Sequence, residues 1–137
     1  YLQLRQHETC QEDETMKLLF ILLVTLLILL AGCSTSSIPQ EKIDVFSKCI
    51  TENGATMYGT FWCPTCAKTK KMFGTSFQYI KYVECDPRGE NEQSELCIQK
   101  GIDKYDTWEF TDGSRIISNP TFEQLSEKTG CPVPGEA

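Results

Sequence analysis

Residues 55–66 read ATMYGTFWCPTC and carry the strongest structural signal in the chain. Positions 55–62 are apolar or aromatic on both faces, a pattern typical of a strand buried in the middle of a sheet. A helix is predicted to begin directly afterwards, because Pro64 suits the first turn of a helix. Cys63 and Cys66 are therefore expected where a central strand passes into a helix.

The position of these two cysteines favours redox chemistry. Unpaired amides and the positive end of the helix dipole stabilise a thiolate at a helix start, so Cys63 is the expected exposed, low-pKa nucleophile. Cys66, one turn on, could then resolve a mixed disulfide at Cys63. A C-x-x-C pair could also be half a zinc site or a structural bridge, but zinc needs a second ligand pair. The chain has no other C-x-x-C and one histidine, His7, so we expect no metal site.

The composition excludes several other functions. The chain has 137 residues, which suits one domain, and 19 acidic against 13 basic side chains give a net charge of −6. Nucleic-acid binding needs a surplus of Lys and Arg on one face, so we expect no nucleic-acid partner. Because His7 precedes the expected start of translation, Ser-His-Asp and Cys-His catalysis are excluded. The remaining residues imply no cofactor.

An export signal is predicted near the N-terminus. Lys17 precedes a Leu-rich run over 18–30, which is shorter than the roughly 20 residues of a membrane-spanning helix. The sequence Leu-Ala-Gly-Cys at 30–33 resembles the lipobox of bacterial-type lipoproteins, whose cysteine is acylated. We therefore expect lipidation at Cys33 and a location on the extracytoplasmic face of the cell membrane. The alternative is an ordinary secretory signal with an incidental cysteine.

The acidic stretch before Met16 has the wrong sign for the flank of a signal peptide. Translation is therefore expected to start at Met16. The predicted organisation is upstream sequence without function at 1–15, a lipoprotein signal peptide at 16–32, a polar tether at 33–40, the folded domain at 41–132 and a tail at 133–137.

Helix and strand signals alternate through the domain in the order α-β-α-β-α-β-β-α, which predicts an α/β fold. Asn119 is the expected cap of the last helix, with Pro120 in its first turn and Gly130 at its end. The predicted segments are helices at 41–53, 63–73 and 92–100, a helix closed by Gly130, and strands at 55–62, 79–85, 107–110 and 115–118.

Ordered motifs along 41–132 carry a family resemblance. They are MYGTFWCPTC at 57–66, KMFG at 71–74, YVECDP at 82–87, LC at 96–97, GI at 101–102 and TW at 107–108. In these motifs the chain resembles the thioredoxin superfamily, which implies a thioredoxin-like fold with a four-stranded mixed sheet flanked by helices. More narrowly, it is similar to the thioredoxin-like domains fused to, or encoded beside, bacterial and archaeal homologues of vitamin K epoxide reductase.

The resemblance implies a membrane-side thiol-disulfide oxidoreductase. Cys63 and Cys66 would exchange electrons with exported proteins and with a quinone-linked membrane partner resembling vitamin K epoxide reductase, in a direction that stays open. A non-enzymatic module that binds a partner protein or a metal through the dithiol is the alternative. The residues expected to contact substrate are Trp62, Pro64, Thr65, Tyr105, Asp106 and Thr107.

Three departures from the family pattern affect the expected chemistry. Asp106 stands where the family has a cis-proline, and a cis peptide before a non-proline residue costs about 2.5–4 kcal/mol, so a trans peptide is expected. Met57 stands at the position of thioredoxin's buried acid, so proton transfer for Cys66 must use water or another group. Thr65 replaces the histidine of many strong oxidants, so no imidazolium supports the Cys63 thiolate and a less oxidising couple is expected.

The other cysteines of the domain are expected to be structural. The family has a bridge at the positions of Cys85 and Cys97, and closing such a loop stabilises by about 3 kcal/mol in the chain-entropy model. Cys49 and Cys131 are left, and even parity in an oxidising compartment favours their pairing. Cys49 also fits the apolar face of its helix and could instead be a buried thiol.

Overall fold

The computed structural model describes residues 15–24 and 38–135, and the chain divides into two units, 1–36 and 37–137. In the first unit, residues 15–24 are helical. Among the described residues no helix is both long and apolar enough to cross a bilayer. Cys33, with most of the predicted tether and part of the predicted signal peptide, lies outside the described residues.

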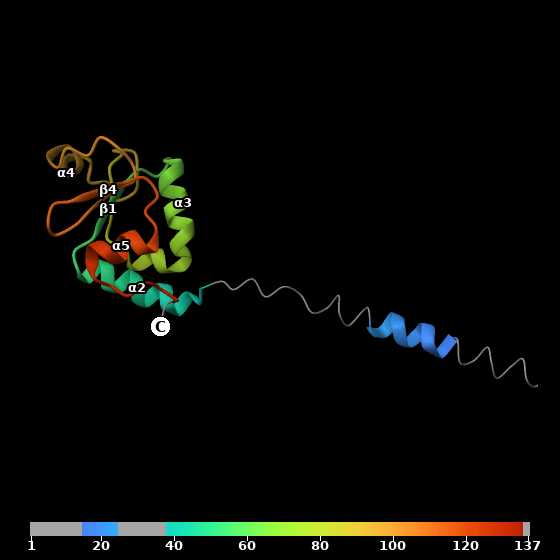
Figure 1. Ribbon diagram of the computed structural model, residues 1–137. Coiled ribbons are helices and arrows are strands. Elements are labelled where there is room, and N and C mark those ends of the chain that lie inside the picture. The colour runs from blue at the N-terminus through green and yellow to red at the C-terminus, as the bar shows by residue number, and fades with distance from the viewer. Residues whose placement is uncertain (1–14, 25–37, 136–137) are drawn as a thin grey trace, which may run out of the picture. The chain divides into compact units, whose positions relative to one another are not determined.

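The second unit is built on a four-stranded sheet with the strand order β2-β1-β3-β4 (Figure 1). β1 pairs in parallel with β2 and antiparallel with β3, and β3 pairs antiparallel with β4. All four residues of β1 are buried, as the apolar pattern predicts for a central strand. The strands are β1 Thr56–Gly59, β2 Tyr82–Glu84, β3 Thr107–Glu109 and β4 Arg115–Ile117.

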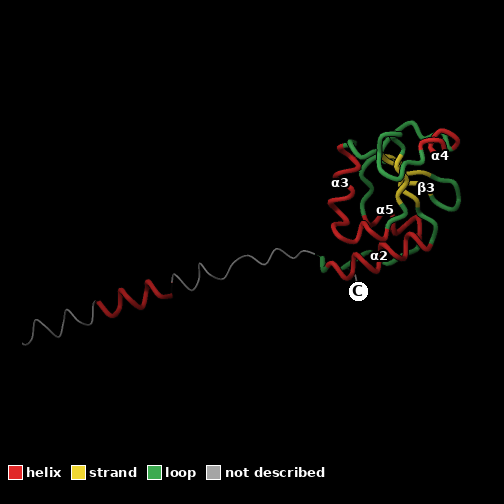
Figure 2. The backbone as a smooth tube through the Cα atoms, turned by 180° about the vertical axis from the view of Figure 1, so that it is seen from behind, coloured by secondary structure: helices red, strands yellow, loops and turns green. Residues whose placement is uncertain are grey.

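Helices flank this sheet, and the predicted α/β class with a mixed sheet is confirmed. α2 and α5 lie side by side at one end of the domain, while α4 lies at the other end (Figures 1 and 2). The helices are α2 Gln40–Glu52, α3 Pro64–Phe73, the 3-10 helix η1 Gly74–Tyr79, α4 Ser94–Gln99 and α5 Phe122–Thr129.

The bounds of α3 follow from local chemistry. Cys63 is its N-cap and Pro64 occupies its first turn, where a missing amide hydrogen costs no helical bond. Gly74 ends the helix with φ 58°, a backbone conformation that strongly favours glycine. These features hold the two cysteines at the junction of β1 and α3.

Aromatic packing fixes α3 against the sheet. The ring of Phe73, on the last residue of α3, stacks on Trp108 of β3 with centroids 5.9 Å apart. Phe122 of α5 meets the edge of the same Phe73 ring at 5.3 Å. Phe73 and Trp108 are fully buried, so this cluster anchors the dithiol helix in the core.

Several predicted element bounds differ from the structure, and β1, for example, ends at Gly59 instead of residue 62. Tyr79 was expected to start a strand, but it ends η1, in which Phe77 packs against both Phe73 and Tyr82. Asn119 does not cap the last helix, and Pro120 precedes that helix instead of lying in its first turn. Thr121 caps the helix, because its hydroxyl accepts from the amide of Gln124 while the Gln124 side chain returns a bond to the Thr121 amide.

Candidate active site

Cys63 lies at the N-terminus of α3 with its sulfur turned toward the helix start. Its Sγ accepts a hydrogen bond from the amide of Cys66 at 3.4 Å and lies 2.9 Å from the hydroxyl of Thr65. Only 5% of the residue is exposed, so the expectation of an exposed thiol was wrong. The sulfur points at the Cys66 amide and the Thr65 hydroxyl rather than into solvent.

These contacts tune the acidity of Cys63. Burial opposes ionisation, but hydrogen bonds from Thr65 and Cys66 outweigh it and lower the pKa of the Cys63 thiol below its ordinary value. The lowered pKa agrees with the expected nucleophile.

Cys66 has the opposite character. It is 1% exposed, and burial, followed by its interaction with Cys63, raises the pKa of its thiol to about 12. The negative charge of Asp106 adds to this rise. One cysteine of the pair is therefore disposed to ionise and the other to keep its proton.

The loop before β3 closes over the dithiol. The Thr65 hydroxyl donates to the carbonyl of Tyr105 at 2.8 Å, which links the C-x-x-C turn to this loop. The Tyr105-Asp106 peptide is cis, so the expectation of a trans peptide was wrong. The buried carboxylate of Asp106 holds this conformation, because it accepts bonds from the Thr69 hydroxyl at 2.8 Å, the Trp108 indole at 3.2 Å and the Asn119 amide at 3.1 Å.

Aromatic side chains form the outer edge of the site. Phe61 and Trp62 are 57% and 54% exposed, and the Tyr105 ring meets Trp62 edge to face at 6.3 Å. The Trp62 indole donates to Asp86 at 2.6 Å, and Arg88 pairs with the same carboxylate. Sequence reasoning missed Asp86 and Arg88, although their turn follows β2 directly.

Hydrogen bonds, chiefly from Arg88 and to a lesser extent from Trp62, hold the pKa of Asp86 well below its ordinary value. This carboxylate is therefore charged at neutral pH and holds the indole of Trp62 beside the dithiol.

The residues expected to contact substrate differ in access. Trp62 and Pro64 are exposed and Thr65 and Tyr105 are half-buried. Asp106 is fully buried, and Thr107 is buried with its hydroxyl donated to the Lys104 carbonyl at 2.7 Å. The side chains of Asp106 and Thr107 therefore shape the site from inside.

Two disulfides brace the domain. Cys49 of α2 is bonded to Cys131 beyond α5, across 82 residues of sequence, and Cys85 after β2 is bonded to Cys97 of α4, across 12. Within the described part of the chain, Cys63 and Cys66 are the free cysteines.

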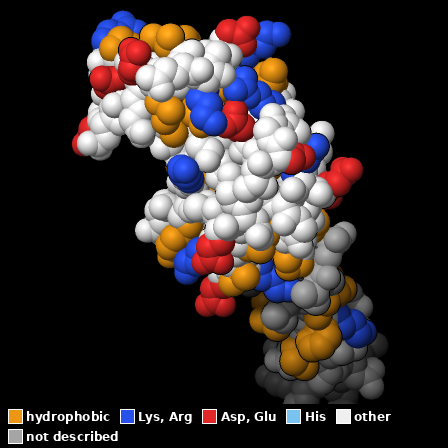
Figure 3. All heavy atoms as spheres, turned by 90° about the vertical axis from the view of Figure 1, so that its left-hand side faces the viewer, with side chains coloured by type: hydrophobic (Ala, Val, Ile, Leu, Met, Phe, Trp, Pro, Cys, Tyr) orange, Lys and Arg blue, Asp and Glu red, His pale blue; other side chains and the backbone are white. Residues whose placement is uncertain are grey.

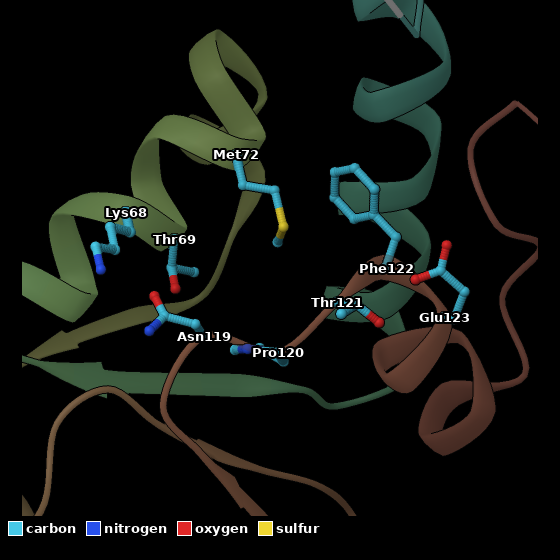
Figure 4. Close-up of a pocket in the computed structure, with 8 residues that line it drawn as sticks. All are labelled: Lys68, Thr69, Met72, Asn119, Pro120, Thr121, Phe122 and Glu123. Atoms are coloured by element: carbon cyan, nitrogen blue, oxygen red, sulfur yellow. The ribbon is translucent and has the colours of Figure 1, made fainter.

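A separate hollow of about 540 Å³ lies beside α3 (Figure 4). Met72 of α3 and Phe122 of α5 point toward each other across it, and Thr69 and Asn119, both partners of Asp106, lie at its other end. On the face shown in Figure 3, acidic and basic side chains are intermingled. Within residues 15–24 and 38–135 no group of three or more His, Cys, Asp or Glu side chains could hold a metal ion.

Comparison with known proteins adds a further observation. No protein-family model matches the chain. It is 34% identical over 102 residues to the "Thiol-disulfide oxidoreductase LTO1" of Arabidopsis thaliana, which amounts to 71% of this chain and 26% of that protein. The chain thus spans about a quarter of the length of the relative. This likeness supports a redox role, and the mixed sheet with its flanking helices fits a thioredoxin-like domain.

Proposed function

We propose that this protein is a thiol-disulfide oxidoreductase that exchanges disulfides with exported proteins through Cys63 and Cys66. The observation that carries the proposal is the asymmetry of the dithiol. Hydrogen bonds lower the pKa of Cys63 at the helix start, whereas burial raises the pKa of Cys66 to about 12. A reactive thiol beside a protected one is the arrangement that stepwise exchange requires.

In the reducing direction, the Cys63 thiolate attacks a client disulfide. A Cys63–client disulfide forms, and one client sulfur leaves as a thiolate and takes up a proton. Cys66, once deprotonated, attacks Sγ of Cys63, the Cys63–Cys66 disulfide forms, and the second client sulfur leaves. Two electrons pass from the dithiol to the client, and the oxidising direction reverses each step.

The rim of the site suits an unfolded client segment. Phe61 and Trp62 offer apolar surface to residues that flank a client cysteine, and Asp86 fixes the orientation of the Trp62 indole. The bond from Thr65 to the Tyr105 carbonyl keeps the loop next to Cys63, where a client backbone would lie.

The proposed location is the extracytoplasmic face of the membrane, through a lipid on Cys33, with a quinone-linked membrane protein resembling vitamin K epoxide reductase as redox partner. The Leu-Ala-Gly-Cys sequence supports this part of the proposal. A Cys33→Ser variant should leave the membrane fraction or accumulate as unprocessed precursor. If the variant were membrane-bound and had the same processed mass as the parent protein, acylation at Cys33 would be contradicted.

The test of the redox function is a pair of substitutions in the full chain. Cys66→Ser should trap Cys63–client mixed disulfides, visible as reducible high-mass bands after acid quenching, because the resolving thiol is gone. Cys63→Ser should abolish exchange while the circular dichroism spectrum stays unchanged. Absence of exchange in the unmodified protein would favour a module that only binds its partner.

A further inference from the structure

To resolve the mixed disulfide, Cys66 must lose its thiol proton, although burial disfavours this loss. A thiol with a pKa near 12 is almost wholly protonated at neutral pH, so attack on the mixed disulfide depends on a nearby acceptor. The inference below rests on the function proposed above and concerns which side chains take this proton.

The side chains of Tyr82 and Cys66 both lie next to the Cα of Gly59. A Cβ placed on Gly59 would lie 2.7 Å from Sγ of Cys66, 3.1 Å from the Tyr82 ring and 3.4 Å from its hydroxyl oxygen. Sγ of Cys66 and the hydroxyl oxygen of Tyr82 are therefore close enough for one water molecule to bridge them. Gly59 on β1 lies beside Glu84 on β2, so the parallel register brings this strand to the dithiol.

The Tyr82 hydroxyl is linked to a buried carboxylate. It donates to Oε2 of Glu84 at 2.8 Å, and Oε1 of Glu84 accepts from the Asp86 amide at 2.9 Å. Glu84 is 5% exposed, and a Cβ on Gly89 would clash with its Cγ, so the loop after β2 covers this side chain closely. Burial, followed by the bond to Glu84, raises the pKa of Tyr82 and keeps the phenol protonated.

The other charged groups near the thiol are less suited to accept its proton. Asp106 acts on Cys66 through its charge, but three donors already occupy its carboxylate. Lys70 has no lone pair to accept a proton, because its side chain is a cation. Its Nζ lies 4.1 Å from the centre of the Tyr82 ring, where its charge stabilises negative charge on that side chain. The ionisable groups that face Cys66 and this tyrosine are Cys63, Lys70, Glu84, Tyr105 and Asp106.

We propose that Tyr82 and Glu84 form a proton relay for Cys66. The Cys66 proton passes to the Tyr82 oxygen, directly or through one water, as the Tyr82 proton passes to Oε2 of Glu84. The products are the Cys66 thiolate, a neutral phenol and a neutral carboxylic acid. The thiolate then forms the bond to Cys63, and the departing client thiolate takes a proton from solvent or from Glu84.

The test uses full-length protein with Cys10→Ser and Cys33→Ser in every sample and the dithiol reduced. Dithiobis(nitrobenzoate) reacts first at Cys63 and releases one coloured thiolate, and attack by Cys66 then releases a second. Tyr82→Phe and Glu84→Gln should each slow the second phase tenfold or more near pH 7, leave the first unchanged, and lose this deficit at high pH, where hydroxide accepts the proton. Tyr79→Phe, at the last residue of η1, is the matched control and should behave as the parent.

The sign of the effect separates a relay from a passive charge. If Glu84 acted only as a negative charge, Glu84→Gln would make Cys66 easier to ionise and would speed the second phase. A second phase that is unchanged or faster in folded Glu84→Gln and Tyr82→Phe proteins overturns the relay and leaves the redox function standing. Absence of the first phase in the parent overturns the redox function, and the relay with it.

Discussion

The sulfur of Cys66 occupies the space that a side chain on Gly59 would need. An added Cβ would lie 2.7 Å from Sγ, closer than real Cβ contacts allow, and the Tyr82 ring closes the same space at 3.1 Å. Because Gly59 has no side chain, the thiol of Cys66 can pack against β1, where burial suppresses its ionisation.

Gly59→Ala should destabilise the domain by about 1–3 kcal/mol, the usual cost of overpacking a core, and should displace Cys66 so that the Cys63–Cys66 disulfide closes more slowly. Urea unfolding and the rate of disulfide closure measure the two effects. A Cys66→Ala background supplies the control, because the smaller side chain leaves room for the methyl group and the cost should shrink. An equal cost in both backgrounds would place the clash elsewhere.

Thr65→Val should raise the pKa of Cys63, because the hydroxyl that stabilises its thiolate is lost. The thiolate fraction falls as pH drops through the pKa, so the alkylation rate of Cys63 should reach its plateau at a higher pH in the variant. In the parent the midpoint of this profile should lie below the ordinary cysteine pKa of about 8.5. Iodoacetamide kinetics against pH measure the shift, and Thr75→Val at an exposed position should leave the profile in place.

Asp106→Asn should destabilise the domain by about 1.5–3 kcal/mol, because the amide cannot accept from all three donors that the carboxylate satisfies. It should also lower the pKa of Cys66, since a negative charge that raises it is removed. Denaturant unfolding and thiol titration measure these effects. Asp103→Asn removes the same charge from an exposed position and should change neither quantity.

The two disulfides should contribute unequally. In the chain-entropy model, closing the 82-residue span of Cys49–Cys131 stabilises by about 4.5 kcal/mol and the 12-residue span of Cys85–Cys97 by about 3 kcal/mol. Replacing each pair by alanine and measuring urea unfolding under oxidising conditions gives the ranking. A larger loss for the shorter loop would mean that its packing over Glu84 outweighs chain entropy.

Local signals in the sequence predicted most of the fold. The doubly apolar run at 55–62 identified the central strand, and Pro64 placed the start of the dithiol helix, because its fixed backbone angle suits a first helical turn. Asn119 misled the prediction, since Thr121 satisfies the helix start better through its reciprocal bonds with Gln124.

What the sequence determined by itself is the order of elements and the placement of Cys63 and Cys66 at a strand-to-helix junction, because these depend on residues close together in the chain. The tertiary structure decided which groups reach the dithiol. Glu84 and Tyr82 come from a neighbouring parallel strand, and Asp106 comes from a loop beyond it. The burial of Cys63 and the cis peptide before Asp106 also depend on contacts between segments that are distant in the chain. Local sequence patterns do not predict such contacts.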